Sequence, residues 1–170
     1  MNKKVKKLAF LGLCTSLALI FAYVEVLIPP LFASVPGIKL GLPNIVIIFI
    51  LYKLGAGYAA AVSFLRIYLA SLLFGNPVTF VYSVAGGFLS LLLMAILKKT
   101  NLLSPIGVSV AGGVFHNVGQ ILVAILLLGT KELGYYLVAL AVSGTLSGIF
   151  IGLCGGFAMK RVPNKFFGER

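Results

Sequence analysis

Six apolar stretches, most of them about 20 residues long, are the feature that most constrains how this chain can fold. They cover residues 8–28, 39–54, 57–74, 78–97, 105–128 and 133–159. About 20 apolar residues in a helix cross the hydrocarbon core of a bilayer, where helices satisfy their own backbone groups. The pattern predicts an all-α integral membrane protein with about six transmembrane helices, forming a single transmembrane domain over residues 1–170.

The composition also requires a lipid bilayer as the solvent. Hydrophobic residues make up 61% of the chain and charged residues only 10%, and the mean hydropathy is +1.14. The sequence contains no Asp and one His, which is too few acid–base groups for most hydrolytic or phosphoryl-transfer sites. We therefore expect that the protein is not an enzyme. The net charge of +11 resides between the apolar stretches, where cations orient helices, so we expect no nucleic-acid partner.

The distribution of Lys and Arg predicts how the chain is oriented. Cytoplasmic connections of bacterial membrane proteins carry the excess of these residues. One set of alternate connections holds Lys3, Lys4, Lys6, Lys7, Lys53, Lys98, Lys99, Lys160, Arg161, Lys165 and Arg170, whereas the other holds Lys39 and Lys131. We expect a multi-pass protein of the bacterial cell membrane with both termini in the cytoplasm. The second stretch is short and contains Pro43, so it is expected to be tilted, broken or only partly spanning.

Small residues recur at every fourth position in two of the stretches. The last stretch contains Gly144, Gly148, Gly152 and Gly156, and the first contains Ala18 and Ala22. Small side chains let helix backbones approach closely inside a membrane. The glycine stripe predicts a helix-packing seam, with a partner or dimer seam as the alternative. The two alanines form a milder version of the same surface.

Several polar side chains lie inside apolar stretches, where they are costly unless they have a role. Arg66 lies about ten residues into the third stretch, roughly 15 Å deep. A cation at that depth needs a partner, which is either an anionic ligand or the carboxylate of Glu25. The remaining predicted ligand-binding residues are polar groups at similar or shallower depths: His116, Asn117, Gln120, Asn44 and Asn76. With a single His and no Asp, we expect no metal site.

Two cysteines, Cys14 and Cys154, also lie in apolar stretches. Cysteine is an ordinary small apolar residue in such helices. A less favoured alternative is that the pair from each of two subunits holds an iron–sulfur cluster, which would make the protein an electron conduit.

Five sequence segments together resemble the Gx transporter family, which is also called heptaprenyl diphosphate synthase component I. They are IPP at 28–30, PGIKLGLPN at 36–44, SLLFGNP at 71–77, SPIGVSVAGG at 104–113 and HNVGQ at 116–120. Pro43 departs from the small residue expected there, and the two cysteines are not part of the family pattern.

The resemblance implies a function in small-molecule uptake. The family is similar in size and layout to the substrate-binding S components of energy-coupling-factor transporters, so an S-component-like bundle is expected, energised by partner ATPase and transmembrane coupling subunits. In S components an Ala-x-x-x-Ala face on the first helix docks the coupling protein, and Ala18 and Ala22 match this motif. The ligand is expected to be anionic, and this function needs no cofactor.

Two alternatives also follow from the resemblance. One is a membrane electron-transfer protein that links quinol to extracytoplasmic flavin, with flavin, quinone or an iron–sulfur cluster as cofactor. The other is a non-catalytic membrane partner in isoprenoid or quinone biosynthesis. Prenyl-diphosphate synthases bind magnesium diphosphate through Asp-rich clusters, and this sequence has no Asp, so the synthase name does not predict catalysis.

Overall fold

The computed structural model describes residues 2–27, 41–129 and 134–163. Within these ranges every regular element is a helix, which confirms the all-α prediction. The helices, in chain order, are α1 (Lys3–Leu27), α2 (Asn44–Lys53), α3 (Ala56–Phe74), α4 (Pro77–Thr100), α5 (Pro105–Leu128) and α6 (Tyr136–Arg161).

Five of these helices are long and apolar enough to cross a membrane, and α2 is not. At 1.5 Å per residue, the ten residues of α2 extend about 15 Å, roughly half of a hydrocarbon core. The count of about six spans is therefore five long helices and one half-length helix. The second stretch was expected to be tilted, broken or only partly spanning, and α2 is only partly spanning. Residues 39 and 40, the start of the predicted stretch, lie outside the described residues.

The short helix α2 lies inside the bundle, in contact with α1, α3 and α6. Residues 46–51 are all buried, with Ile48, Ile50 and Leu51 fully enclosed. Its C-terminal end receives a hydrogen bond from another helix, because Lys98 Nζ of α4 donates to the Leu51 carbonyl at 2.6 Å. A cation at a helix C-terminus satisfies an otherwise open carbonyl and complements the helix dipole. A neighbouring helix thus supplies the hydrogen-bond donor that lipid lacks.

Helices α5 and α6 pack backbone against backbone along the glycine stripe. Gly144 lies against Gly113, and a Cβ on Gly148 or Gly152 would lie 2.5 or 2.7 Å from a Cα atom of α5. The predicted packing seam is therefore present at these three glycines. Gly156 is not part of it, since a Cβ there would meet nothing within 4 Å. At this last turn of α6, the face that carries Gly156 no longer points toward α5. The neighbouring Gly155 packs instead, against Ile48 of α2.

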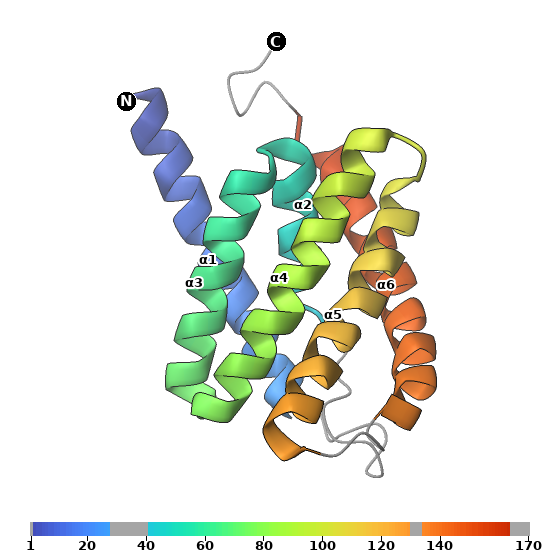
Figure 1. The fold of residues 1–170 in the computed structure, drawn as a ribbon. Helices are drawn as coiled ribbons and strands as arrows, with labels where there is room; N and C mark the ends of the chain where they lie inside the picture. The colour runs from blue at the N-terminus through green and yellow to red at the C-terminus, as the bar shows by residue number, and fades with distance from the viewer. Residues whose placement is uncertain (1, 28–40, 130–133, 164–170) are drawn as a thin grey trace.

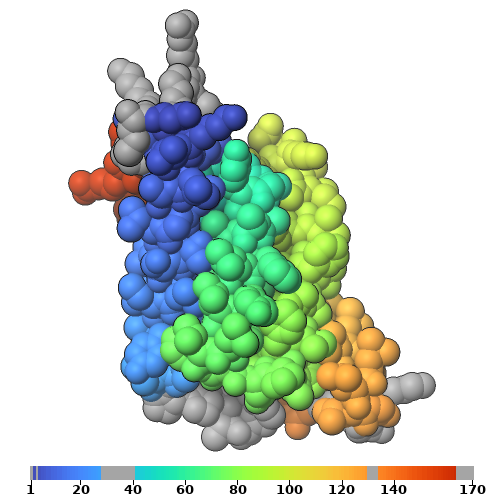
Figure 2. All heavy atoms as spheres, turned by 90° about the vertical axis from the view of Figure 1, so that its left-hand side faces the viewer, coloured from blue at the N-terminus to red at the C-terminus, as the bar shows by residue number. Residues whose placement is uncertain are grey.

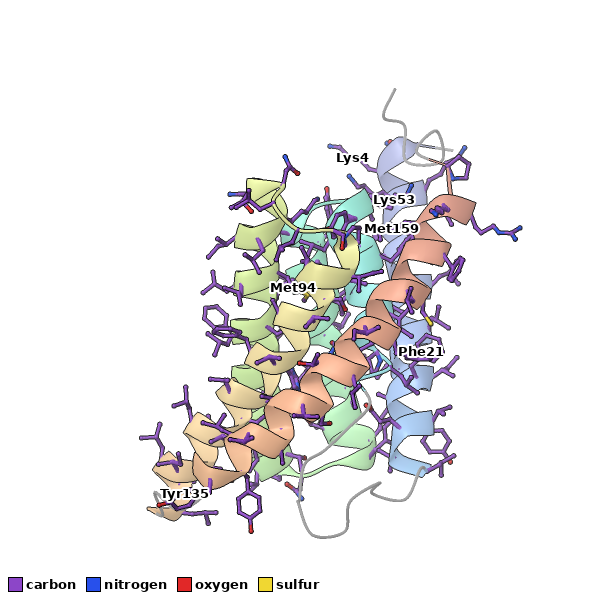
Figure 3. The ribbon with its side chains drawn as sticks, turned by 90° about the vertical axis from the view of Figure 1, so that its right-hand side faces the viewer. Lys4, Phe21, Lys53, Met94, Tyr135 and Met159 are labelled. Atoms are coloured by element: carbon purple, nitrogen blue, oxygen red, sulfur yellow. The ribbon has the colours of Figure 1, made fainter. Side chains whose placement is uncertain are left out.

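Apart from Arg66, the described cations lie at one end of the bundle. The start of α1 and the end of α6 lie at the same end (Figure 1). Lys4, Lys53 and Met159 lie at that end and Tyr135 at the opposite one (Figure 3). Lys39 and Lys131, which the charge count placed on the other side, are outside the described residues. The cytoplasmic location of the basic end remains a prediction from the positive-inside rule.

Helix α1 lies along α3 at the edge of the bundle, and α4 lies beyond α3 (Figure 2). The outward side chains of α1 are apolar and exposed, including Leu8 and Leu13, as expected for contact with lipid. Its inward side holds Ala18 and Ala22, which are 0% and 8% exposed. Both alanines are therefore covered by the chain's own helices. This contradicts the prediction that they form a free docking face, because their small size serves packing inside this chain.

Candidate functional site

A cavity of about 120 Å³ lies between α1, the start of α2, α3, α4 and α5. Five of the six residues predicted to bind a ligand line it: Arg66, Asn44, His116, Asn117 and Gln120. The space corresponds to several water molecules, since about 10–15 Å³ of such volume holds one. It suits a small polar molecule or a polar headgroup.

Arg66 projects from the middle of α3 and supplies a positive charge to this cavity. Its Nη2 donates to Asn44 Oδ1 at 3.1 Å, which fixes one side of the guanidinium against the start of α2. Its Nε is buried and has no hydrogen-bond partner among the described residues. A buried donor of this kind is costly to leave unsatisfied. The guanidinium is thus anchored at one nitrogen and has donor capacity left for a further acceptor.

Glu25 of α1 lines the same cavity as Arg66 and interacts with it electrostatically. Its Oε1 accepts a hydrogen bond from the backbone N–H of Gly41. Gly41 has φ +73°, a left-handed conformation that favours glycine, and it leads the chain into α2. The sequence suggested Glu25 as an alternative partner for Arg66. In the structure the two groups share one pocket as opposite charges, while Arg66 donates a hydrogen bond to Asn44.

The three polar residues of α5 have different roles. Asn117 is buried and its Nδ2 donates to the Leu140 carbonyl of α6 at 2.7 Å, so its amide already ties two helices together. His116 and Gln120 lie against Gly86 of α4, where a Cβ would be 2.7 Å from the His116 carbonyl oxygen and 3.0 Å from Gln120 Cγ. Glycine at that position lets α4 close the cavity beside them.

Asn76, the sixth residue predicted to bind a ligand, does not line this cavity. It is exposed and caps the start of α4. Its Oδ1 accepts from the Thr79 N–H at 2.9 Å, and the Thr79 hydroxyl accepts from the Asn76 N–H at 2.9 Å. This reciprocal capping box was visible in the sequence as Asn-Pro-x-Thr, with proline at the first helical position.

Three hydroxyl groups outside the predicted ligand-binding set also line the cavity: Ser71, Thr79 and Ser83. Thr79 and Ser83 are four residues apart, so they lie on one face of α4. That spacing is the signal that could have identified them. Ser71 is on α3, five residues after Arg66. The hydroxyls add donors and acceptors for neutral polar atoms of a ligand.

The cysteines are positioned for packing and not for a shared cluster. Both are free thiols, and Cys14 is buried in the core between α1 and α2, with Cys154 partly exposed on α6. A cluster shared by two subunits needs both thiols at the surface, which contradicts that alternative for Cys14. Among the described residues, no group of three or more His, Cys, Asp and Glu side chains could hold a metal ion.

One of the comparisons with known proteins identifies a family. Residues 14–158 match the family described as heptaprenyl diphosphate synthase component I. No curated relative and no solved structure matches the chain. The matched region includes every described residue that lines the cavity. Since the match covers most of its length, the chain belongs to the heptaprenyl diphosphate synthase component I family.

Proposed function

We propose that this protein is a non-catalytic membrane partner of an isoprenoid-synthesising enzyme and that it binds a small anionic ligand between its helices. The family description supports the first part, because it names a component of a prenyl-diphosphate synthase. The cavity supports the second part, because it contains a guanidinium inside a membrane helix.

The observation that carries the ligand-binding part is the bonding of Arg66. A cation in a transmembrane helix must face protein or water and find a partner. Among the described residues, its guanidinium donates to the neutral amide of Asn44, and its buried Nε has no partner there. A carboxylate or phosphate oxygen is the acceptor that matches the remaining planar donors of an arginine.

The acid content of the chain supports a partner role over catalysis. A prenyl-diphosphate synthase needs several carboxylates to hold magnesium against diphosphate. The sequence has three acidic residues in all, and Glu25 is the one that lines the cavity. A soluble catalytic component would supply the carboxylates, and the membrane component would supply the bilayer location and the ligand pocket.

The position of the cavity favours a second candidate function, uptake of the ligand from outside the cell. The cavity reaches the turn between α3 and α4, where Phe74, Gly75 and Thr79 line it. This turn is at the end of the bundle opposite the basic end (Figure 1). If the basic end is cytoplasmic, this end of the cavity faces outward. A bundle similar to an S component would then deliver the ligand inward with partner ATPases, docked on a surface other than Ala18 and Ala22.

Ligand binding is tested by native mass spectrometry of the protein extracted in mild detergent. We expect a small anion to remain bound to the wild type and to be lost from Arg66→Gln. The matched control is Arg161→Gln, which removes an exposed cation at the basic end. Retention of the same anion by a folded Arg66→Gln variant would contradict the ligand-binding part.

The partner role is tested by adding the protein, in lipid nanodiscs, to the purified catalytic heptaprenyl diphosphate synthase component from the same organism. We expect co-sedimentation of the two and a higher yield of heptaprenyl diphosphate. With neither effect the partner role fails, and measurement of ligand flux into vesicles that contain the ATPase and coupling subunits then decides the uptake candidate.

A further inference from the structure

We infer that Asn44 is the positioning residue of this anion site, because its neutral amide holds the Arg66 guanidinium in place without compensating its charge. The inference rests on the proposed ligand binding and deepens it. The sequence placed Asn44 among the residues expected to contact a ligand. Its contacts in the structure instead let it act through Arg66, so that an incoming carboxylate meets a cation whose direction is already set.

The contact between the two side chains joins two helices inside the cavity. Arg66 lies in the middle of α3, Asn44 is the first residue of α2, and both line the cavity. Arg66 Nη2 donates to Asn44 Oδ1 at 3.1 Å. An arginine side chain has many rotamers, and fixing one before the ligand arrives removes an ordering cost from binding. A guanidinium held in this way is prepared for two parallel hydrogen bonds to a carboxylate.

The start of α2 is a rigid support for this contact. Residues 46–51 are all buried, and the Asn44 N–H donates to the Gly41 carbonyl at 2.8 Å. The other end of the helix is tied to α4, where Lys98 donates to the Leu51 carbonyl. Functional groups on buried helices keep their geometry better than groups on loops. The half-length helix therefore gives Asn44 a fixed position opposite Arg66.

The amide of Asn44 faces Arg66 with its oxygen. Its Nδ2 is close to Gly41 instead, since a Cβ on that glycine would lie 3.2 Å from it. An aspartate in the same place would offer a charged acceptor with two oxygens, and such a pair would satisfy the guanidinium in the way that a ligand carboxylate does. Asparagine has nearly the same shape and no charge. It therefore supplies the directional contact and does not compete with the ligand.

The test separates the direction of Arg66 from its charge by using two anions. Butyrate has a planar carboxylate that needs an oriented fork, whereas bromide is spherical and needs only a cation. Binding of each is measured by isothermal titration calorimetry on the detergent-solubilised protein, in a buffer free of other small carboxylates and halides. We expect the wild type to bind butyrate about tenfold or more tightly than bromide, because a second charge-assisted hydrogen bond is made.

Two substitutions at Asn44 change one property each. Asn44→Ala removes the acceptor, so the affinity for butyrate should fall about tenfold, toward that for bromide, while bromide binds as before. Asn44→Asp keeps an acceptor and adds a charge, so both anions should bind about tenfold or more weakly. The thermal stability of that variant should not fall, because an acid is favourable in the first turn of a helix and pairs with Arg66. Asn101→Asp, which adds the same charge at an exposed turn outside the cavity, should bind both anions as the wild type does.

The outcomes distinguish this inference from the proposed function, with Arg66→Gln as the reference for loss of the anion site. The positioning role is overturned if the wild type does not prefer butyrate, if Asn44→Ala keeps that preference or loses both anions equally, or if Asn44→Asp binds them as the wild type does. Anion binding then still stands, provided that Arg66→Gln binds neither probe. If Arg66→Gln binds both as the wild type does, or if neither probe binds the wild type, the anion site and the inference fail together. Either Asn44 variant is decisive by itself if the other does not fold.

Discussion

The two halves of the bundle are built in different ways, and the cavity lies between them. In α4–α6 the helices touch backbone to backbone through glycines, at Gly113 and Gly144 and again at Gly86 and Gly119. In α1–α3 the contacts around the buried helix α2 run through side chains, both large ones such as Phe49 and small ones such as Ala18. The charged groups of the cavity, Glu25 and Arg66, both come from this second half. One half thus provides a closely packed wall, and the other provides the charges.

The largest effect is expected where the backbones touch. Gly148→Ala places a Cβ 2.5 Å from the Val110 Cα, so α5 and α6 must separate. We expect a loss of about 3 kcal/mol in the free energy of unfolding, measured in mixed detergent micelles. The matched variant is Gly156→Ala, which meets nothing within 4 Å and should gain up to about 1 kcal/mol from helix propensity. Equal effects of the two variants would mean that α5 and α6 do not pack backbone to backbone at Gly148.

A smaller loss is expected from added volume in the other half. Ala18 is 0% exposed, so Ala18→Leu overfills the core beside α2, and we expect a loss of about 2 kcal/mol. Ala9→Leu adds the same volume at an exposed position of the same helix and should be neutral. A stable Ala18→Leu protein that instead lost a binding partner would restore the docking role of this face.

The capping box of α4 predicts an effect of about 1 kcal/mol. Asn76→Ala removes the acceptor for the Thr79 N–H, and Asn76→Ser keeps one, so thermal unfolding should detect a loss in the first variant only. Ligand binding should not change in either variant, because Asn76 does not line the cavity. Weaker binding in both variants, with unchanged stability, would return Asn76 to the site.

The smallest effect concerns Asn117, whose side chain joins the two neighbouring helices of the glycine-packed half. Asn117→Ala removes the hydrogen bond to the Leu140 carbonyl, and such bonds in membranes average about 0.6 kcal/mol. Gln120→Ala should leave stability unchanged and weaken ligand binding instead, since Gln120 lines the cavity. Similar stability losses in the two variants would show that both are structural.

Most of the fold could be predicted from the sequence, because the length and polarity of apolar stretches fix helices almost without tertiary information. The half-length α2 was harder, since a buried helix and a spanning helix are equally apolar, and only Pro43 and the short stretch hinted at the difference. The rotation that replaces Gly156 with Gly155 depends on the crossing of three helices, which a repeat of four residues does not encode.

The site was predicted in part for a related reason. Depth along each helix brought Arg66 and His116 to one level, and the structure places both in the cavity. Depth does not specify which way a helix faces. Two features depend on how a helix is rotated about its axis. They are the burial of Ala18 and Ala22 on the inward face of α1 and the hydrogen bond of Asn117 to α6. The role of Asn76 was a local pattern that its position near the end of a stretch obscured.

The half-length of α2 has a consequence for how the chain is made. At about 15 Å it cannot stay in the bilayer alone, because its ends would leave open carbonyls and N–H groups in lipid. One of its carbonyls is satisfied by Lys98 of α4, and its flank is covered by α6, which is synthesised after the other five described helices. The centre of the protein therefore becomes stable only after translation has passed α6, and a chain interrupted before α6 presents an unfinished core to the quality-control proteases of the membrane.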